Sequence, residues 1–401
     1  MDWETKRIKD IIQLKARIGW KGLRSDEFQT NSYAYLVTGQ DFNSSEIIWA
    51  GCYQIDKERY EEDPYIQLKN GDVLVTKDGT IGKVAMVNNL DKPACLNSGV
   101  FVLKQKQKVF NQKYLFWELS SSIFRDFIKE NSDGSTIQHL YQNVFDFMNV
   151  IIPPIEIQCK IANFLDAKTQ NIDTKIKLLE KKKERYIILR KAIINEALNS
   201  NGKNWKTLRI KDIAESIIGL TYSPDDIVDE SEGVLVLRSG NIQDGKTVFN
   251  DNVYVNAEID KKLHLKKGDV LMCSRNGSAS LIGKCSFIDK KYDNCTWGAF
   301  MTVIRSKYGK FLYWIFNSHI LEDCKGMFQT STVNQLTARV LDNISIPLPS
   351  LDEQQKISDY LDKKTSSIDS IIEKITTEIN SLKTYRRALI NEAVTGKLKI
   401  E

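Results

Sequence analysis

The sequence predicts an α+β protein (mixed α/β) built as a tandem duplication, in which two mixed bodies are each followed by a long helical segment. Three observations support this fold class: a helical stretch occurs twice, strand-rich stretches precede each copy, and prolines separate strands from helices. We expect the bodies at residues 1–152 (body 1) and 203–346 (body 2). The helical segments then occupy residues 153–202 and 347–401.

The duplication covers most of the chain. Residues 155–200 align with 351–396 without a gap, and 16 of the 46 positions are identical. Three shorter matches extend it through the bodies: STIQHL (135–140) with STVNQL (331–336), LKNGDVL (68–74) with LKKGDVL (265–271), and WETKRIKDI (3–11) with WKTLRIKDI (205–213).

Each body shows the same order of strand and helix signals. Residues 71–87 contain β-formers on both sides of Asp78-Gly79, and residues 268–288 repeat the plan around Asn276-Gly277 with a longer insertion. Residues 114–128 and 311–321 are amphipathic at helical spacing.

Prolines mark the entry to each helical segment. The sequence then predicts a short helix that ends at Asp166 in the first copy and at Asp362 in the second, followed by a longer helix. Apolar residues of the longer helix alternate at spacings of four and three, as in a coiled-coil seam, with Lys183, Arg190 and Arg386 interrupting it. The expected helix-pairing residues are Ile172, Ile176, Leu179, Tyr186, Ile193, Ile368, Ile372, Ile375, Ile379, Leu382 and Leu389.

The two long helices are expected to pair with each other in an antiparallel coiled coil. The two halves would then be related by a pseudo-two-fold axis, like a dimer fused into one chain. Roughly 32 helical residues at about 1.5 Å each give a rod of about 48 Å, with one body at each end.

Composition and motifs exclude several classes of protein. The seven cysteines form no CxxC pair, and three histidines leave no visible zinc set, so scattered thiols favour a reducing cytoplasm. The polar start MDWETKRIKD is unlike a signal peptide, and no apolar run is long enough to span a membrane. GSASLIGKC (277–285) has one residue too many for a phosphate-binding loop, and the motifs of methyl transfer, a catalytic triad or a nuclease are absent.

The chain resembles the specificity subunits of type I restriction–modification systems over its whole length. The resemblance is based on IPPIEIQCKIANFLD (152–166), PLPSLDEQQKISDYLD (347–362), both long helices and the STI/STV loops. The Glu-Gln pair of the family is present as Glu353-Gln354, whereas the first copy has Ile157-Gln158. A partner-docking role is therefore clearer for Gln354 than for Gln158.

The resemblance implies a non-catalytic subunit with two target-recognition domains, each recognising half of a split, asymmetric site in double-stranded DNA. The paired helices would set the spacer and dock two methyltransferase subunits, and nuclease/translocase subunits would complete the complex. No cofactor is expected in this chain; S-adenosylmethionine, ATP and magnesium belong to the partner subunits. The alternatives are a coiled-coil scaffold for other proteins and a stand-alone DNA-modifying enzyme with duplicated recognition domains.

Polar side chains on loops are the expected base contacts, because base edges are recognised by Arg, Lys, Asn, Gln, Asp, Ser and Thr. The candidates are Lys77, Asp78, Thr80, Ser135, Thr136, Gln138, Arg238, Asn241, Arg275, Asn276, Ser278, Thr330, Ser331, Thr332 and Asn334. The same residues also have explanations that involve no ligand. Asp78 and Asn276 can form plain hairpin turns, and the Ser-Thr pairs can cap helices. Residues 168–191 contain nine basic and three acidic side chains, which favours a solvated helix face over contact with spacer phosphates.

Overall fold

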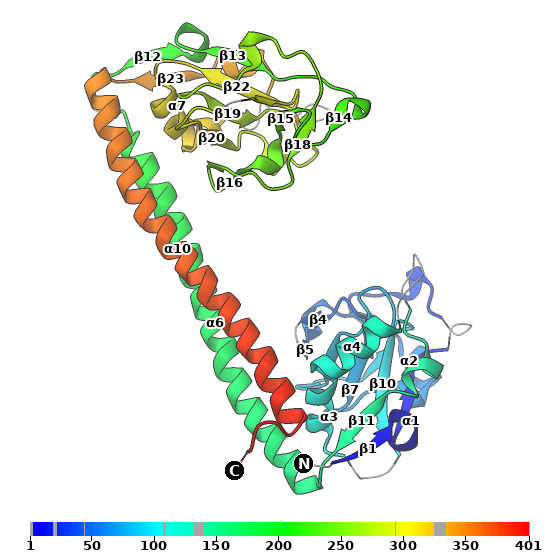
Figure 1. The fold of residues 1–401 in the computed structure, drawn as a ribbon. Coiled ribbons are helices and arrows are strands. Elements are labelled where there is room, and N and C mark those ends of the chain that lie inside the picture. The colour runs from blue at the N-terminus through cyan, green and yellow to red at the C-terminus, as the bar shows by residue number, and fades with distance from the viewer. Residues whose placement is uncertain are drawn as a thin grey trace. The chain divides into compact units, whose positions relative to one another are not determined.

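A computed structural model describes residues 3–18, 22–43, 45–106, 110–131, 139–201, 203–292, 294–324 and 334–400. The chain divides into two compact units: unit 1 is Met1–Glu180 with Thr377–Glu401, and unit 2 is Lys181–Thr376. Each unit therefore contains one body together with parts of both long helices (Figure 1).

Body 1 is built on an antiparallel sheet that is joined to a second, smaller sheet. The first sheet has the order β2(Ile12–Lys15), β10(Val100–Gln105), β7(Val73–Thr76), β8(Val84–Met86). The second has the order β6(Tyr53–Ile55), β3(Ala34–Val37), β9(Ala94–Leu96), with β3 and β9 parallel. Two ribbons pair β1(Glu4–Arg7) with β11(Asn149–Ile152) and β4(Phe42–Asn43) with β5(Glu46–Ile47). The helices are α1(Ile8–Ile11), α2(Lys57–Glu61), α3(Gln112–Leu119), α4(Ser122–Glu130) and α5(Gln142–Phe145).

Body 2 repeats this topology with one additional strand, β14(Ile227–Val228), at the edge of its second sheet. Its first sheet has the order β13(Glu215–Ile218), β22(Met301–Arg305), β19(Val270–Cys273), β20(Cys285–Phe287). Its second has the order β14(Ile227–Val228), β18(Val253–Val255), β15(Val234–Leu237), β21(Cys295–Trp297), with β15 and β21 parallel. The ribbons pair β12(Lys206–Arg209) with β23(Ser345–Leu348) and β16(Ile242–Gln243) with β17(Lys246–Thr247). The helices are α7(Gly309–Phe316), α8(His319–Glu322) and α9(Ala338–Asp342). The matching strand orders confirm the predicted α+β duplication.

The repeated LK-x-GDVL phrase forms the turn that leads into β7 and β19. Its glycine has a φ of +91° in body 1 and +96° in body 2, a conformation that favours glycine. The next residue, Asp72 or Asp269, is buried and is held by a cation from the last residues of β10 or β22. Lys104 Nζ lies 2.6 Å from Asp72 Oδ2, and Arg305 Nη2 lies 2.7 Å from Asp269 Oδ2. The repeated phrase therefore forms the same turn, with the same buried aspartate, in both bodies.

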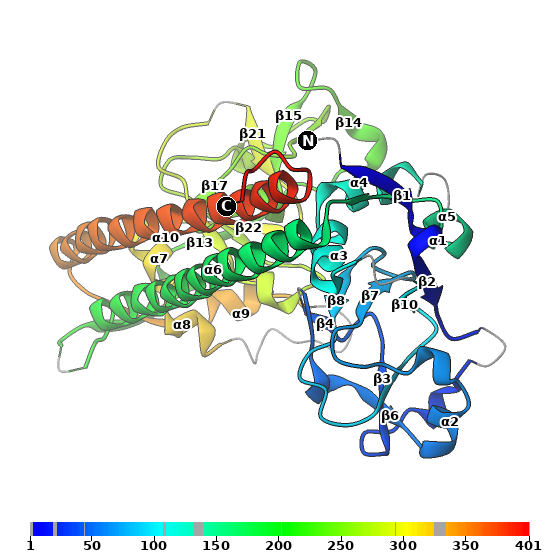
Figure 2. The same ribbon diagram turned by 90° about the horizontal axis from the view of Figure 1, so that it is seen from below.

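The two amphipathic stretches each form a pair of helices rather than one. Ser121 caps α4 through a hydrogen bond from Ile123 N, and Ser318 caps α8 in the same way. The first helix of each pair packs on a sheet: α3 contacts β7 and β8 (Figure 2), and α7 contacts β19 and β20.

The long helices are α6(Ile155–Ala197) and α10(Leu351–Val394), and each is continuous. The helix break expected at Asp166 and Asp362 is therefore wrong. An aspartate disfavours a helix interior when its carboxylate competes for backbone groups, but here both carboxylates bind side chains of a body. Lys113 Nζ lies 2.6 Å from Asp166 Oδ2, and Lys310 Nζ lies 2.9 Å from Asp362 Oδ1.

Among the described residues, no helix combines the length and the apolar character needed to cross a membrane. In the same part of the chain, no group of three or more histidine, cysteine, aspartate or glutamate side chains is arranged to hold a metal ion.

Candidate nucleic-acid interface and its helical support

The burial of the expected helix-pairing residues is compatible with a seam between α6 and α10, and Ile193 also packs against the core of body 2. Ile172, Ile176, Ile368, Ile375, Ile379 and Leu389 are buried, and Leu179, Tyr186, Ile193, Ile372 and Leu382 are half-buried. The pairing is antiparallel: in unit 1, Asp173 and Lys175 of α6 form ion pairs with Arg386 and Glu378 of α10.

The arginines that interrupt the apolar pattern have partners across the helix pair. Arg190 Nε lies 2.8 Å from Asp369 Oδ1 in unit 2, and Arg386 Nε lies 2.9 Å from Asp173 Oδ1 in unit 1. Both aspartates and both arginines are separated by 196 positions from their copies. An antiparallel pair of equivalent helices brings each aspartate to the other helix's arginine, so the two ion pairs are equivalent.

The repeated INEA phrase near the end of each long helix holds a body. Asn391 Oδ1 accepts a hydrogen bond from Ser122 N at 2.6 Å, and Asn195 Oδ1 accepts one from His319 N at 2.9 Å. Both donors lie in the first turn of a body helix, where backbone N–H groups lack intrahelical partners. The phrase thus provides a hydrogen-bond acceptor for the first turn of α4 in unit 1 and for the first turn of α8 in unit 2.

Gln158 and Gln354 are buried at the start of the long helices. Gln158 Nε2 donates to Pro153 O and Gln354 Nε2 donates to Pro349 O, both at 2.8 Å. Gln158 Oε1 also accepts from Asn111 N at 2.8 Å. A buried amide that closes the helix entry does not present a surface, so partner docking by the Gln354 side chain is not supported.

One buried acid, Glu118, distinguishes body 1 from body 2. Glu118 of α3 is fully buried and accepts a hydrogen bond from Ile151 N. Burial raises the pKa of Glu118 to about 8, against a smaller lowering by that hydrogen bond. Body 2 has Ile315 at the matching position of α7, as the alignment of YLFWEL (114–119) with FLYWIF (311–316) shows.

In body 1, residues 77–80, which follow β7, meet residues 139–140, and we call these two segments and their equivalents in body 2 the meeting loops. Asp78 forms a bridge with His139, and Asp78 Oδ1 shares a hydrogen bond with His139 Nδ1, so this Asp-Gly segment is more than a hairpin turn. Lys77 is half-buried with its Nζ 5.5 Å from the centre of the Phe101 ring. Thr80 is exposed.

In body 2, the equivalent loops meet in the same way. Arg275 forms a bridge with Gln335, and its Nη2 donates to Gln335 Oε1 at 2.7 Å. Asn276 Nδ2 lies 3.3 Å from Ser239 Oγ, and Asn334 Nδ2 donates to Gly277 O at 3.1 Å. The structure therefore brings the predicted segments 238–241, 275–278 and 334 together, and Ser278 lies exposed among them. We call residues 238–241, 274–278, 300 and 334–335 the body 2 loop cluster.

Asn241 has a structural role that argues against base contact. Its side chain is 1% exposed. Its Oδ1 accepts from Arg238 N at 2.8 Å, and its Nδ2 donates to Val248 O at 3.1 Å. Asp41 closes the matching loop of body 1 by accepting from Thr38 N at 2.7 Å. Arg238 is half-buried and its Nη2 contacts Asp251 O at 3.1 Å.

Six of the predicted contact residues lie outside the described residues: Ser135, Thr136, Gln138, Thr330, Ser331 and Thr332. On α6, Lys181 and Lys182 are exposed and Lys183 is half-buried at the seam.

Sequence reasoning missed His139, Gln335 and Phe300. The internal alignment contains a signal for the first two, because Asp78 and His139 in body 1 are replaced together by Arg275 and Gln335 in body 2. Phe300 has no such signal. It becomes visible only through the strand register, which pairs Val100 with Thr76 and Met301 with Cys273. This register places Phe300 where body 1 has Gly99.

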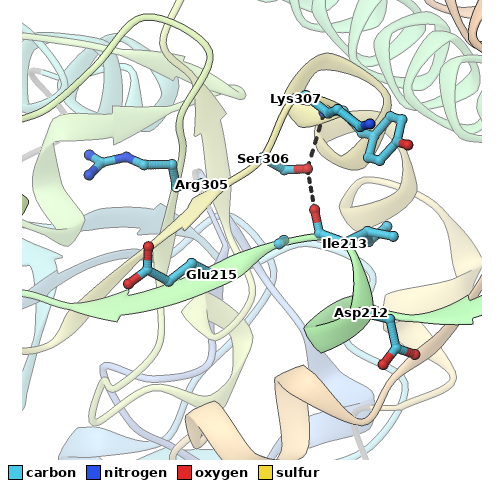
Figure 3. Close-up of a pocket in the computed structure, with 8 residues that line it drawn as sticks. Asp212, Ile213, Glu215, Arg305, Ser306 and Lys307 are labelled. Carbon is cyan, nitrogen blue, oxygen red and sulfur yellow. Dashed lines mark hydrogen bonds between the residues drawn. The ribbon is translucent and has the colours of Figure 1, made fainter.

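A pocket of about 560 Å³ lies elsewhere on body 2, between β13 and the end of β22 (Figure 3). Ser306 Oγ donates to Ile213 O at 2.6 Å and accepts from Tyr308 N at 3.1 Å. The Arg305 guanidinium forms an ion pair with Asp269. Ser306 and Arg305 therefore serve the fold, and we assign no ligand to this pocket.

Comparisons with known proteins agree with this architecture. The family model of the type I restriction modification DNA specificity domain matches residues 1–184 and 202–381. The type I restriction enzyme MjaVIII specificity subunit of Methanocaldococcus jannaschii is 24% identical, over 100% of this chain and 94% of that protein.

Two solved structures have the same fold. One comes from work on complex assembly and conformational transition of the type I R-M system, with a TM-score of 0.72, 17% identity and coverage of 99% of this chain and 98% of that one. The other is the HsdS subunit from Thermoanaerobacter tengcongensis, with a TM-score of 0.50, 16% identity and coverage of 99% and 97%. The chain belongs to the family of type I restriction–modification DNA specificity subunits.

Proposed function

We propose that this chain is the DNA sequence-specificity subunit of a type I restriction–modification complex, in which each body recognises one half of a bipartite, asymmetric site. One observation carries the proposal: the two bodies share a framework and a helical support, while the side chains at their meeting loops differ. Asp78 faces His139 in body 1, whereas Arg275 faces Gln335 in body 2. Different side chains at equivalent positions would select different base pairs.

The helices are the proposed docking surface for two identical methyltransferase subunits. Equivalent positions of α6 and α10 expose apolar side chains: Ile155 with Leu351, and Leu189 with Tyr385. Exposed apolar groups repeated at equivalent positions suit two copies of one partner. We also propose that the helix pair fixes the gap between the half-sites, because both units contain parts of the same two continuous helices.

The subunit itself is proposed to be non-catalytic, working in the cytoplasm with nuclease/translocase subunits that complete the complex. Its seven cysteines are free. S-adenosylmethionine, ATP and magnesium would bind the partner subunits, where methyl transfer and translocation take place.

The test is methylation-site sequencing with the methyltransferase partner. The assembled complex, given S-adenosylmethionine and a random DNA library, should methylate one split motif with two unlike halves. The chain alone should modify nothing. Methylation without a bipartite motif, or catalysis by the chain alone, would overturn the proposal.

A further inference from the structure

Phe300 is an exposed aromatic residue of the body 2 loop cluster. It is 58% exposed, although its backbone is fixed: its carbonyl accepts hydrogen bonds from Ser274 N and Arg275 N, each at 3.0 Å. A large apolar side chain held in solvent by a rigid backbone suits contact with another molecule.

Arg275 lies against this ring in a prearranged position. Its Cζ is 5.5 Å from the centre of the Phe300 ring, within the range of a cation–π contact. Its Nη2 is held by Gln335 Oε1 at 2.7 Å. The backbone on both sides is also tied, because Leu336 N donates to Ser274 O at 2.8 Å. An arginine fixed in this way loses little conformational freedom on binding.

Body 1 lacks this pair at the same framework position. Gly99 stands where body 2 has Phe300, and Asp78 stands where body 2 has Arg275. Body 1 therefore presents a carboxylate paired with His139 and has no side chain at the position of Phe300, whereas body 2 presents a guanidinium against the Phe300 ring. The difference lies at the meeting loops, whereas the surrounding strand pairing is equivalent.

We propose that Arg275 and Phe300 together determine the base preference of body 2. Arg275 selects a guanine through its major-groove edge, and the Phe300 ring packs against the neighbouring base. This inference rests on the proposed function. Guanine is the base whose O6 and N7 acceptors match the guanidinium fork. Aromatic rings pack on bases or on the thymine methyl group. Gln335 is a positioning residue that holds the guanidinium.

The test measures base preference, position by position, in the motif methylated by the assembled complex. In Arg275→Ala and Arg275→Lys, discrimination at one guanine of one half-site should fall by about 5- to 150-fold, since a bidentate contact contributes on the order of 1–3 kcal/mol. Phe300→Gly, which installs the residue of body 1, should relax the adjacent base pair. Gln335→Leu should weaken the guanine preference, while Gln335→Glu, which keeps the acceptor, should retain it.

Phe147→Ala is the matched control, because Phe147 is similarly exposed but lies in body 1, where its ring contacts Arg7 and Lys9. It should leave both half-sites unchanged. A uniform loss of DNA affinity in Arg275→Ala with unchanged base preference would mean a phosphate contact and would overturn the inference. An unchanged motif in Arg275→Lys and Phe300→Gly would overturn it as well. Failure of the proposed function differs from both results, because the unaltered complex would then show no bipartite motif.

Discussion

The two bodies contain the same strand register around different interiors. In body 1, Arg17 is 2% exposed, with Nη1 3.2 Å from Asp63 Oδ2 and Nε donating to Leu96 O at 3.1 Å. Body 2 has Trp297 at the strand position of Leu96. It also has Gly219, where a Cβ would lie 2.5 Å from the Trp297 ring.

An ion pair in one body and a tryptophan packed on a glycine in the other support equivalent sheets. Backbone pairing therefore defines the framework of each body, and side chains vary within it. The same rule applies at the meeting loops, where we assign the base preferences.

The largest expected effect is in the interior of body 1. Asp63→Ala leaves the Arg17 guanidinium buried without its carboxylate, which should destabilise body 1 by about 3–5 kcal/mol. Hydrogen exchange of the full chain, followed by mass spectrometry, should show faster exchange in peptides of body 1 and unchanged exchange in body 2. Equal loss in both bodies, or none, would show that the ion pair is not the element that distinguishes them.

The second prediction concerns pH. Folding raises the pKa of Glu118 from its ordinary value of 4.5 to about 8, because burial disfavours the charged carboxylate. Body 1 is therefore most stable below the unfolded pKa, where Glu118 is protonated in both the folded and the unfolded state. Its free energy of unfolding should decline as pH rises toward about 8, and Glu118 should cause no further change above that pH. Body 1 should therefore lose protection between pH 5 and pH 8, after correction for intrinsic exchange, while body 2 with Ile315 should not.

Glu118→Gln is the control for this pH dependence. It keeps an acceptor for Ile151 N but does not titrate, so the pH dependence of body 1 should flatten toward that of body 2. A slope that persists in this variant would assign the effect to other groups.

A smaller effect is expected at the helix pair. Removing Arg190 or Arg386 should each cost about 1 kcal/mol, because both pairs are charge-assisted and partly shielded from solvent. The Arg190–Asp369 pair should contribute more and depend less on salt, since Asp369 is less exposed than Asp173. Double-mutant cycles on urea unfolding measure both couplings, and zero coupling in both would refute the ion-pair account of the interrupted seam.

Asn195→Ala and Asn391→Ala should have the smallest effects, about 0.5–1 kcal/mol each, from loss of one hydrogen bond to a helix start. The change should be local: the His319 amide should exchange faster in the first variant, and the Ser122 amide in the second. Faster exchange at the wrong body in either variant would contradict the assignment.

The sequence predicted what repetition and periodicity encode, and it failed where tertiary contacts decide. The strand–turn–strand segments and the long helices follow from β-formers and from four-three spacing. The continuity of α6 through Asp166 did not follow, because the carboxylate is bound by Lys113 and by Trp117 Nε1 at 2.9 Å, far away in the sequence. Asn241 looked like a base-contacting residue because its burial by residues 248–252 is invisible in the local pattern. Phe300 was missed because only the strand register relates it to Gly99.

Equivalent frameworks are proposed to carry different base preferences. The most direct test replaces residues 205–348 with a second copy of residues 3–152, which preserves the helix contacts, and sequences the sites methylated by the assembled complex. Because the paired helices are antiparallel, the account predicts that the split motif becomes symmetric, with both halves equal to the half recognised by body 1. A motif that keeps its original, unlike halves would contradict the claim.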